Sequence, residues 1–336
     1  MANSYLTIDM VTRESLRVAH ETAAFLGTVD RSYDDSFAKT GGKIGSALRI
    51  RKPNQYTVRT SGQAMDVQDQ SETSVSVTVA SLYGVDMEFY HDELALDIDD
   101  FSDRYISPAV KRLVSKVESD CFATATKAVF NQTGTAGTRV GSSSGDISAL
   151  FNARARLNQM LAPKDSRALQ TDSVTMGAIV NGNKGIFAPV ADVGKAFREG
   201  LYARSAMADL YENERIYTHT NSSDVTGSTE SSAGVTDGGS TIDMHTTVAS
   251  PAVGSVFTVA GVYACHPETK VSLGYLQQFV VTVTSASAAV TVAPTIYLSG
   301  GKQNVCKSDS TALATTDFNS QTLTFSALYC EGIPLR

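Results

Sequence analysis

The 336-residue sequence predicts an α+β protein, and three observations lead to that class. Residues 46–90 contain runs in which apolar and polar side chains alternate, which is the period of a strand. Residues 107–130 carry apolar side chains at helical spacing. Residues 251–300 again alternate in short runs with turn residues between them. We therefore expect a β-hairpin, a long helix and a small antiparallel β module in one chain.

The composition and charge exclude several classes of protein. Hydrophobic residues make up 42% of the chain and charged residues 19%, which is typical of a folded protein and excludes global disorder. The net charge of −7 argues against a dedicated nucleic-acid binder, because neutralising phosphates requires clustered Lys and Arg. No apolar run is long enough to cross a bilayer, and the first 13 residues lack the apolar core of a secretory signal. We therefore expect a protein that folds in a cytoplasm.

The N-terminal segment is expected to be helical over residues 7–26. Asp9 or Thr12 can cap its start with a side-chain oxygen, and Gly27 can supply the left-handed residue that ends it. The polar stretch 28–45 that follows has no helical period and contains a Gly-Gly break. We therefore expect the helix to end before the alternating region begins.

The alternating region is expected to be a long hairpin that faces solvent. Its strand-like runs are Ala47–Arg51, Tyr56–Arg59 and Val75–Val79, and the polar link 61–74 joins two arms. A two-stranded ribbon is only marginally stable by itself in water. The hairpin is therefore expected to lie on another body.

The long helix is expected to begin at Ser107 and to run to about Phe130. Ser107 is a suitable N-cap, and Pro108 falls in the first turn, where its missing N–H costs no hydrogen bond. At 1.5 Å per residue the helix would be about 35 Å long. Its expected apolar stripe consists of Val110, Leu113, Val114, Val117, Cys121, Ala125 and Ala128.

Two shorter helices and a β module are expected in the rest of the chain. One helix is capped by Asp146 and stopped by Pro163, and another spans about 189–198. The apolar side of the first consists of Ile147, Leu150, Phe151, Leu157 and Leu161. Residues 219–250 are dense in Ser, Thr, Gly and Asp, which is typical of a linker or loop. The strands of the module are expected at 256–259, 279–283 and 289–292.

Residues that could carry chemistry are scarce. Residues 141–145 match the nucleophile-elbow pattern G-x-S-x-G with Ser143 at its centre, but the preceding residues form a poor strand. His91-Asp92-Glu93 and Cys265-His266 are adjacent residues whose side chains point apart, so we expect no metal site there. Without a C-x-x-C pair, four buried or half-buried thiols are expected at Cys121, Cys265, Cys306 and Cys330. We expect no catalytic, cofactor or metal site.

Charge is distributed unevenly around the hairpin and the long helix. The base of the hairpin is basic through Arg49, Arg51, Lys52 and Arg59. The entry to the long helix is acidic through Asp97, Asp99, Asp100 and Asp103. Two interpretations remain open: two separate solvated faces, or a basic ribbon of one subunit that lies over the acidic group of a neighbour.

Several strings taken together resemble one family. The strings are LTIDMVTRE at 6–14, YDDSFAKTGGKIG at 33–45, LRIRKPNQYTVR at 48–59, VQD at 67–69, YTHT at 217–220, and the stretch 254–281. In combination they are similar to the coat proteins of tailed phages, and in particular to the P-22-type major capsid family with the HK-97 fold.

The resemblance implies a division of the chain into six parts. They are an N-terminal arm at 1–30, an extended hairpin called the E-loop with its flanks at 31–90, a peripheral domain with the long spine helix at 91–139, an axial domain at 140–220, an inserted β domain at 221–300, and a return to the axial and peripheral body at 301–336.

The resemblance also implies a function in the virion, with assembly in the cytoplasm of a bacterial host. The chain would form the hexamers and pentamers of an icosahedral head that encloses double-stranded DNA without sequence-specific binding. A scaffolding protein and a portal would be partners, and the chain would not be an enzyme, bind a cofactor or enter a membrane. Two alternatives stay open: a β-rich tail or surface adhesin that forms trimers, and a serine hydrolase that uses Ser143.

Overall fold

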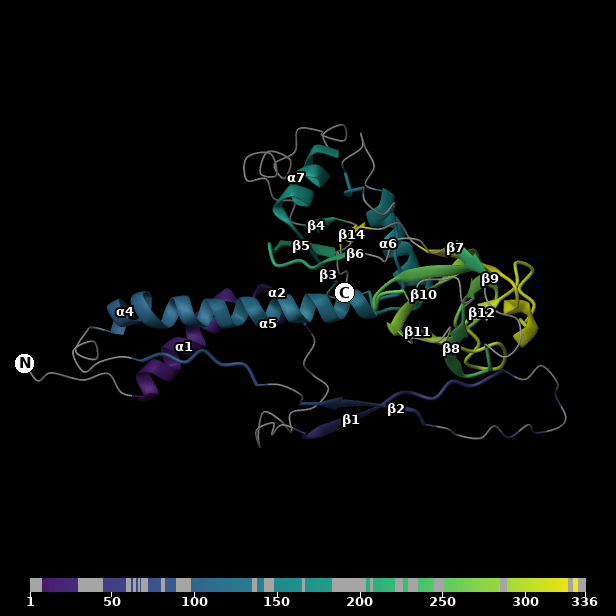
Figure 1. Ribbon diagram of the computed structural model, residues 1–336, viewed down its shortest axis with the longest axis horizontal. Helices are drawn as coiled ribbons and strands as arrows, with labels where there is room; N and C mark the ends of the chain where they lie inside the picture. Colours follow the sequence, from purple (N-terminus) through teal and green to yellow (C-terminus); the bar gives the residue numbers. More distant parts are fainter. Residues whose placement is uncertain are drawn as a thin grey trace, which may run out of the picture. The chain divides into compact units, whose positions relative to one another are not determined.

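The computed structural model confirms the α+β class, with 34% helix and 29% strand. Two compact units make up the chain: one contains residues 1–54 and 67–121, and the other contains 55–66 and 122–336 (Figure 1). The structure describes residues 8–29, 45–58, 62, 65, 67, 72–79, 82–88, 98–134, 138–141, 148–164, 167–182, 204–205, 208–220, 226–228, 235–244, 251–284, 289–325 and 329–331. No helix in these ranges is both long and apolar enough to span a membrane.

The first unit consists of helices and one hairpin. Its elements are α1 (Ile8–Thr22), α2 (Ala24–Thr28), β1 (Ala47–Arg51), β2 (Ser74–Thr78), α4 (Ile98–Phe101), the π-helical turn η2 (Ser102–Ile106) and most of α5 (Ser107–Ala128). Its buried apolar side chains include Val18, Phe101, Ile106 and Val114.

The expected N-terminal helix is divided in two at Ala23, which has a non-helical ψ of 89°. The prediction that Gly27 ends the helix is wrong, because Gly27 lies inside α2 and the extended Val29 follows its last turn. Thr12 does not cap either, since its hydroxyl donates to the Ile8 carbonyl from within α1. Directly after the break, the Phe25 N–H in the first turn of α2 donates to the buried carboxylate of Glu118 at 2.8 Å, which satisfies a backbone donor at the helix start.

The long helix is confirmed, but it does not begin where the sequence predicted. The helical run starts at Ile98 and passes through η2 into α5 (Figure 1), and Ser107 has helical φ and ψ of −60° and −46°. Ser107 is therefore not an N-cap. A proline ring inside an α-helix clashes with the carbonyl four residues earlier, and the wider π turn directly before Pro108 accommodates it.

The buried face of α5 differs from the predicted stripe. Its fully or nearly buried positions are Val114, Glu118 and Phe122, which are spaced by four residues. Cys121 is only half-buried. The prediction missed Glu118 because a carboxylate is rarely buried, and only the contact with α2 explains its place.

The two arms of the hairpin are confirmed as antiparallel strands. The register pairs Ala47 with Thr78 and Arg51 with Ser74, and the Lys52 N–H extends the ladder to the Thr73 carbonyl. The expected third run is wrong over residues 56–58, which are not in a strand. Pro53, which cannot donate a ladder hydrogen bond, lies three residues before this segment.

The second unit is built around a seven-stranded antiparallel sheet. The strand order is β7-β13-β9-β10-β11-β8, and β12 also pairs with β9. The strands are β7 (Thr226–Ser228), β8 (Gly239–Asp243), β9 (Val256–Cys265), β10 (Ser272–Val283), β11 (Ala289–Ile296), β12 (Val305–Cys306) and β13 (Thr322–Phe325). The rings of Phe257 and Phe279 lie 5.9 Å apart in a large buried apolar core.

The sheet includes strands that come both before and after the expected β module in the sequence. The Ser/Thr-rich stretch 219–250 was predicted as a linker or loop, yet it supplies β7 and β8. Threonine is a good strand former, so a stretch rich in it can pair once a neighbouring strand offers its edge. Beyond residue 300, β12 and β13 join the same sheet.

Two glycines shape the pairing of β9 with β10. Gly261 and Gly274 have φ values of 80° and 79°, and the register of this pair shifts next to each of them. A bulge places one residue in a conformation that glycine adopts without strain. The long central strands of the sheet are therefore bent at positions that the sequence marks.

The remainder of the second unit combines helices with short strands. These elements are α6 (Ser148–Gln159), β3 (Ala168–Thr171), α7 (Ser173–Gly182), β4 (Arg204–Ser205), β5 (Ala208–Glu212), β6 (Thr218–Thr220), the 3-10 turn η4 (Thr315–Phe318) and β14 (Tyr329–Glu331). β3 runs parallel to β5, and β14 pairs with β6. A small core is formed by Leu150, Leu169, Met176, Ile179, Ala208 and Leu210.

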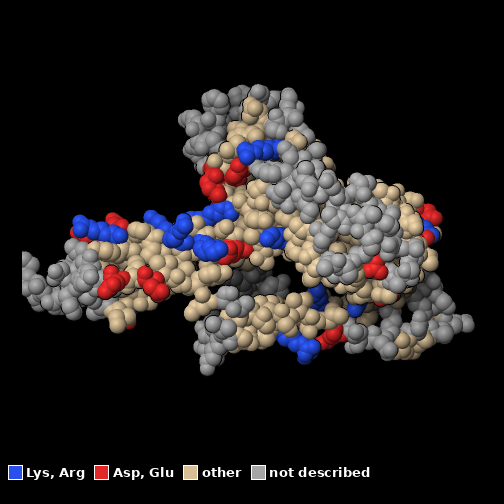
Figure 2. All heavy atoms as spheres, in the orientation of Figure 1, with Lys and Arg blue, Asp and Glu red and all other residues tan. Residues whose placement is uncertain are grey.

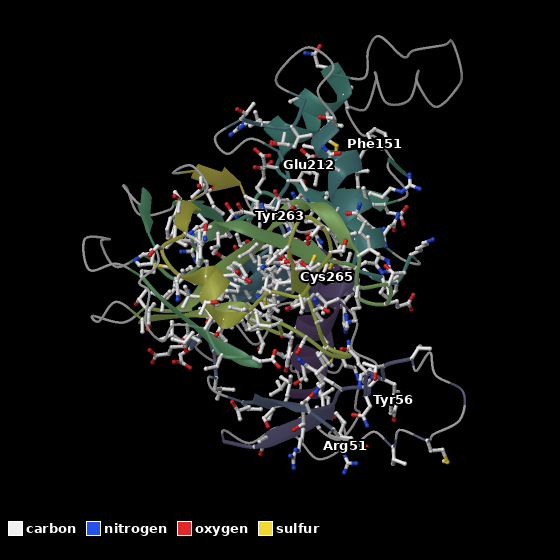
Figure 3. All side chains as sticks on the ribbon, turned by 90° about the vertical axis from the view of Figure 1, so that its right-hand side faces the viewer. Arg51, Tyr56, Phe151, Glu212, Tyr263 and Cys265 are labelled. Atoms are coloured by element: carbon white, nitrogen blue, oxygen red, sulfur yellow. The ribbon has the colours of Figure 1, made fainter. Side chains whose placement is uncertain are left out.

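The α6 helix ends before the proline that was predicted to stop it. Leu161 has a left-handed φ of 59°, and the Ala162 N–H donates back to the Leu157 carbonyl at 2.9 Å. Such an arrangement terminates a helix without proline. Phe151 belonged to the expected apolar side but is 46% exposed (Figure 3). The expected cap Asp146 and the expected helix at 189–198 lie outside the described residues.

Candidate self-association surface

The β1–β2 hairpin presents two chemically different faces. The register places Leu48 opposite Val77 and Ile50 opposite Val75, so these four apolar side chains share one face. The other face carries Ala47, Arg49, Arg51, Ser74, Ser76 and Thr78. We call the first the apolar face and the second the basic face of the hairpin.

The apolar face is accessible. Val75 and Val77 expose 43% and 47% of their surface, and Leu48 and Ile50 are half-buried. Within the described residues, β1 and β2 form a sheet of their own with no third strand. A ribbon of two strands needs a packed layer for stability. The apolar face is therefore suited to pack against another folded body.

The basic face is held by contacts between the strands. The Arg49 Nε donates to the Ser74 Oγ at 2.8 Å, and the Arg51 Nη1 lies 3.1 Å from the Glu72 Oε2. Figure 3 labels Arg51 on this ribbon. The Arg51–Glu72 pair is well exposed, and such pairs contribute about 0.2–1 kcal/mol. These contacts align the strands and leave the guanidinium groups accessible.

The predicted basic group is brought together only in part. Arg49 and Arg51 share the basic face, Lys52 follows β1 as an exposed residue, and Arg59 lies outside the described residues. Arg49 and Arg51 are therefore the two predicted basic residues whose side chains the register places side by side.

The predicted acidic group lies on the short helical run before α5. Asp100 in α4 and Asp103 in η2 are exposed, Asp99 is part of α4, and Asp97 lies outside the described residues. Among the described residues, no ion pair joins these carboxylates to the basic face. Pairing of the two groups between neighbouring subunits therefore stays a prediction.

Residues 55–66, which come shortly after β1 in the chain, belong to the second unit. A Cβ built on Gly301 would lie 3.3 Å from the Gln55 carbonyl oxygen and 3.4 Å from the Thr57 methyl group. Gly301 therefore packs closely against residues 55–57, whereas Val58 is almost fully exposed. This contact does not involve the four residues of the apolar face.

The N-terminal helix is attached to the helical run by a polar contact. The Ser102 Oγ donates to the Glu14 Oε1 at 2.8 Å, and the Arg17 Nε donates to the other carboxylate oxygen at 2.9 Å. The hydrogen bond from Arg17, and after it the one from Ser102, lowers the pKa of Glu14 to about 2. Ile8 and Leu16 on the same helix remain exposed.

Lys and Arg side chains also gather along α5 (Figure 2). Exposed members are Lys111, Arg112 and Lys116, and the Lys116 Nζ lies 2.7 Å from the Asp120 carboxylate four residues later. This row lies on one helix of the first unit. The sequence analysis did not single it out, because the charges are spread between apolar positions.

The described residues contain no cluster of three potential metal ligands. As expected, Cys265 (labelled in Figure 3) and Cys306 are buried thiols and Cys121 is half-buried, while the side chain of Cys330 lies outside the described part of the structure. Burial raises the pKa of the Cys265 thiol to about 12, so it is a poor nucleophile at neutral pH.

The proposed nucleophile Ser143 lies outside the described residues, but the glycine that opens its motif does not. Gly141 has a φ of +82°, and a Cβ there would lie 2.5 Å from the Ala178 carbonyl oxygen. Gly141 is therefore required by close packing against the backbone of α7. This requirement is independent of catalysis.

Comparison with known proteins does not assign a family. No protein-family model matches the chain, and no curated protein matches it at a significant level. The likeness to phage coat proteins therefore rests on the strings quoted above, and the function is argued from the hairpin and its surroundings.

Proposed function

We propose that this chain is the self-assembling subunit of a shell. In its specific form the proposal is a major capsid protein that builds the hexamers and pentamers of an icosahedral phage head around double-stranded DNA. The observation that carries it is the β1–β2 ribbon, which has no third strand among the described residues and whose apolar face is partly exposed. A second copy of the chain is the cover that the proposal assigns to this face.

The two faces of the hairpin would have different roles in assembly. Packing of Leu48, Ile50, Val75 and Val77 on a neighbouring subunit supplies binding free energy through burial of apolar surface. Arg49 and Arg51 would meet the acidic group near Asp100 of another copy, and such charge pairs select register and partner more than they add affinity. Of that group, Asp100 and Asp103 would supply carboxylates that are exposed in the isolated chain.

Other features agree with a shell subunit. The 22-residue helix α5 gives the first unit an extended scaffold, and the seven-stranded sheet gives the second unit a core of its own. By the resemblance stated above, the partners would be a scaffolding protein and a portal, and the chain would assemble in a bacterial cytoplasm and remain in the virion. The proposal gives the chain no enzymatic role and no cofactor.

One observation favours a second candidate. The seven-stranded antiparallel sheet is the larger core of the chain, which is also typical of β-rich tail or surface proteins that bind as trimers. In this candidate, the accessible apolar face of the hairpin has a role only if the hairpin forms the contact between the subunits of the trimer. The two candidates therefore differ in the assembly that they predict.

Negative-stain electron microscopy of the purified chain, together with sedimentation velocity, tests the proposal. Shells, or rings of five and six subunits, are the expected result. Uniform trimers would favour the second candidate. A chain that stays monomeric at high concentration would refute both.

A further inference from the structure

In the second unit, the half-buried Arg156 of α6 contacts β10 and has no carboxylate partner in the part of the chain that the structure describes. The Arg156 guanidinium carbon lies 4.3 Å from the centre of the Tyr275 ring, and its Nη1 donates to the Gln278 Oε1 at 2.6 Å. The same Gln278 oxygen accepts the Gln132 N–H at 2.8 Å. Arg156 belongs to α6, and Tyr275 and Gln278 belong to β10; both elements are labelled in Figure 1.

The charge of Arg156 is not compensated within the described residues. No Asp or Glu lies within ion-pair distance of its guanidinium there, and the Gln278 contact is its only hydrogen bond in that part of the chain. Burial lowers the pKa of Arg156, which measures the cost of holding this cation away from water. A guanidinium has five N–H donors, so most of them remain available.

A second unsatisfied group belongs to the same stacked pair. The Tyr275 hydroxyl is buried and has no hydrogen-bond partner among the described residues. A buried hydroxyl without a partner costs about 1–3 kcal/mol, so native proteins rarely retain one without a reason. Arg156 and Tyr275 therefore offer several donors, whereas the side-chain acceptor that Arg156 contacts among the described residues, the Gln278 oxygen, is already shared by two donors.

We propose that Arg156 and Tyr275 form a binding site for an oxyanion, a carboxylate or a phosphate, which accepts hydrogen bonds from the free guanidinium N–H groups and from the Tyr275 hydroxyl. Arginine is suited to bidentate recognition of such groups, and stacking on Tyr275 holds its plane in place. Gln278 fixes the guanidinium from its other edge. Two sources can supply the oxyanion: inorganic phosphate in solution, or an Asp or Glu side chain of a second copy. Only the latter source rests on the proposed shell function.

The key variant is Tyr275→Phe, because it removes the hydroxyl and keeps the stacked ring. If the hydroxyl has no ligand, this change removes an unsatisfied group and leaves phosphate binding and assembly unchanged. If the site binds an oxyanion, the change weakens that binding about 10-fold or more, which is the usual effect of losing a hydrogen bond to a charged group. Arg156→Gln is expected to abolish the binding, and Arg154→Gln removes the same charge from the same helix as a matched control.

The experiment has two arms. In the first, dilute protein is titrated with inorganic phosphate by isothermal calorimetry, and this arm does not depend on assembly. In the second, assembly without phosphate is followed by light scattering. Loss of phosphate binding in Tyr275→Phe but not in Arg154→Gln supports a free anion as the ligand. Loss of assembly in Tyr275→Phe but not in Arg154→Gln, when the wild-type chain does not bind phosphate, supports a carboxylate of a second copy as the ligand. No phosphate binding by the wild-type chain, together with normal assembly of Tyr275→Phe, overturns the inference.

Discussion

Replacing Val75 and Val77 with threonine tests whether the apolar face of the hairpin drives association. The change keeps the shape and strand preference of both side chains and makes the face polar. The two valines expose 43% and 47% of their surface, which together is close to one whole side chain. Burying a hydroxyl without a hydrogen-bond partner costs about 1–3 kcal/mol, so each such substitution at a contact between subunits weakens association by about 5- to 150-fold.

Sedimentation velocity over a concentration series measures this effect, and electron microscopy shows whether shells or rings still form. The matched control is Ser74→Thr with Ser76→Thr, which alters the same strand on the basic face and keeps both hydroxyl groups. The valine variant is expected to shift assembly to at least 10-fold higher concentration while the serine variant assembles as the wild type does. Equal assembly of both variants and the wild type would refute the assignment of the apolar face to a subunit contact.

Three further predictions concern other contacts. Changing Arg49 and Arg51 together to glutamine is expected to slow or weaken assembly. Far-ultraviolet circular dichroism should stay unchanged, because the contacts of both residues within the hairpin are exposed. A normal shell yield would count against the charge-pairing interpretation. Glu118→Ala is expected to destabilise α2 by about 1–3 kcal/mol, because the Phe25 N–H loses this acceptor, whereas Glu118→Gln retains a side-chain oxygen. Hydrogen exchange over residues 24–28 measures the difference between the two variants. Equal exchange in both would contradict the prediction. The pKa of Glu14 is about 2 in the folded chain against an ordinary value of 4.5, so its contribution to stability is present above pH 4.5 and is lost as the pH falls toward 2. Acid unfolding of Glu14→Gln, followed by circular dichroism, should therefore show a weaker pH dependence between 4.5 and 2 than the wild type, and an unchanged profile would contradict the assignment.

The local elements were predictable where the signal lies in neighbouring residues. Alternation in Ala47–Arg51 and in Val75–Val79 predicted β1 and β2 to within one residue, because strand periodicity is a property of a few consecutive side chains. The helical spacing from Val110 onward predicted α5 for the same reason. The predictions failed where contacts with distant groups are involved, as next to the break at Ala23, where the carboxylate of Glu118 accepts the N–H of Phe25.

The candidate surface shows the same division. The alternation of Arg49 and Arg51 with Leu48 and Ile50 places a basic and an apolar face on one strand, and that much follows from the sequence. Which residues of β2 join each face depends on the register of the strands, and a slip by one residue would exchange the two faces.

The sequence by itself therefore determined the α+β class, the two arms of the hairpin and the long helix. Only the tertiary structure decided that the Ser/Thr-rich stretch 219–250 supplies sheet strands, that β13 returns to pair with β9, and that Arg156 meets Tyr275. The physical reason is that strand pairing and burial join residues far apart in the chain. A local pattern of side chains carries no information about which partner will be adjacent.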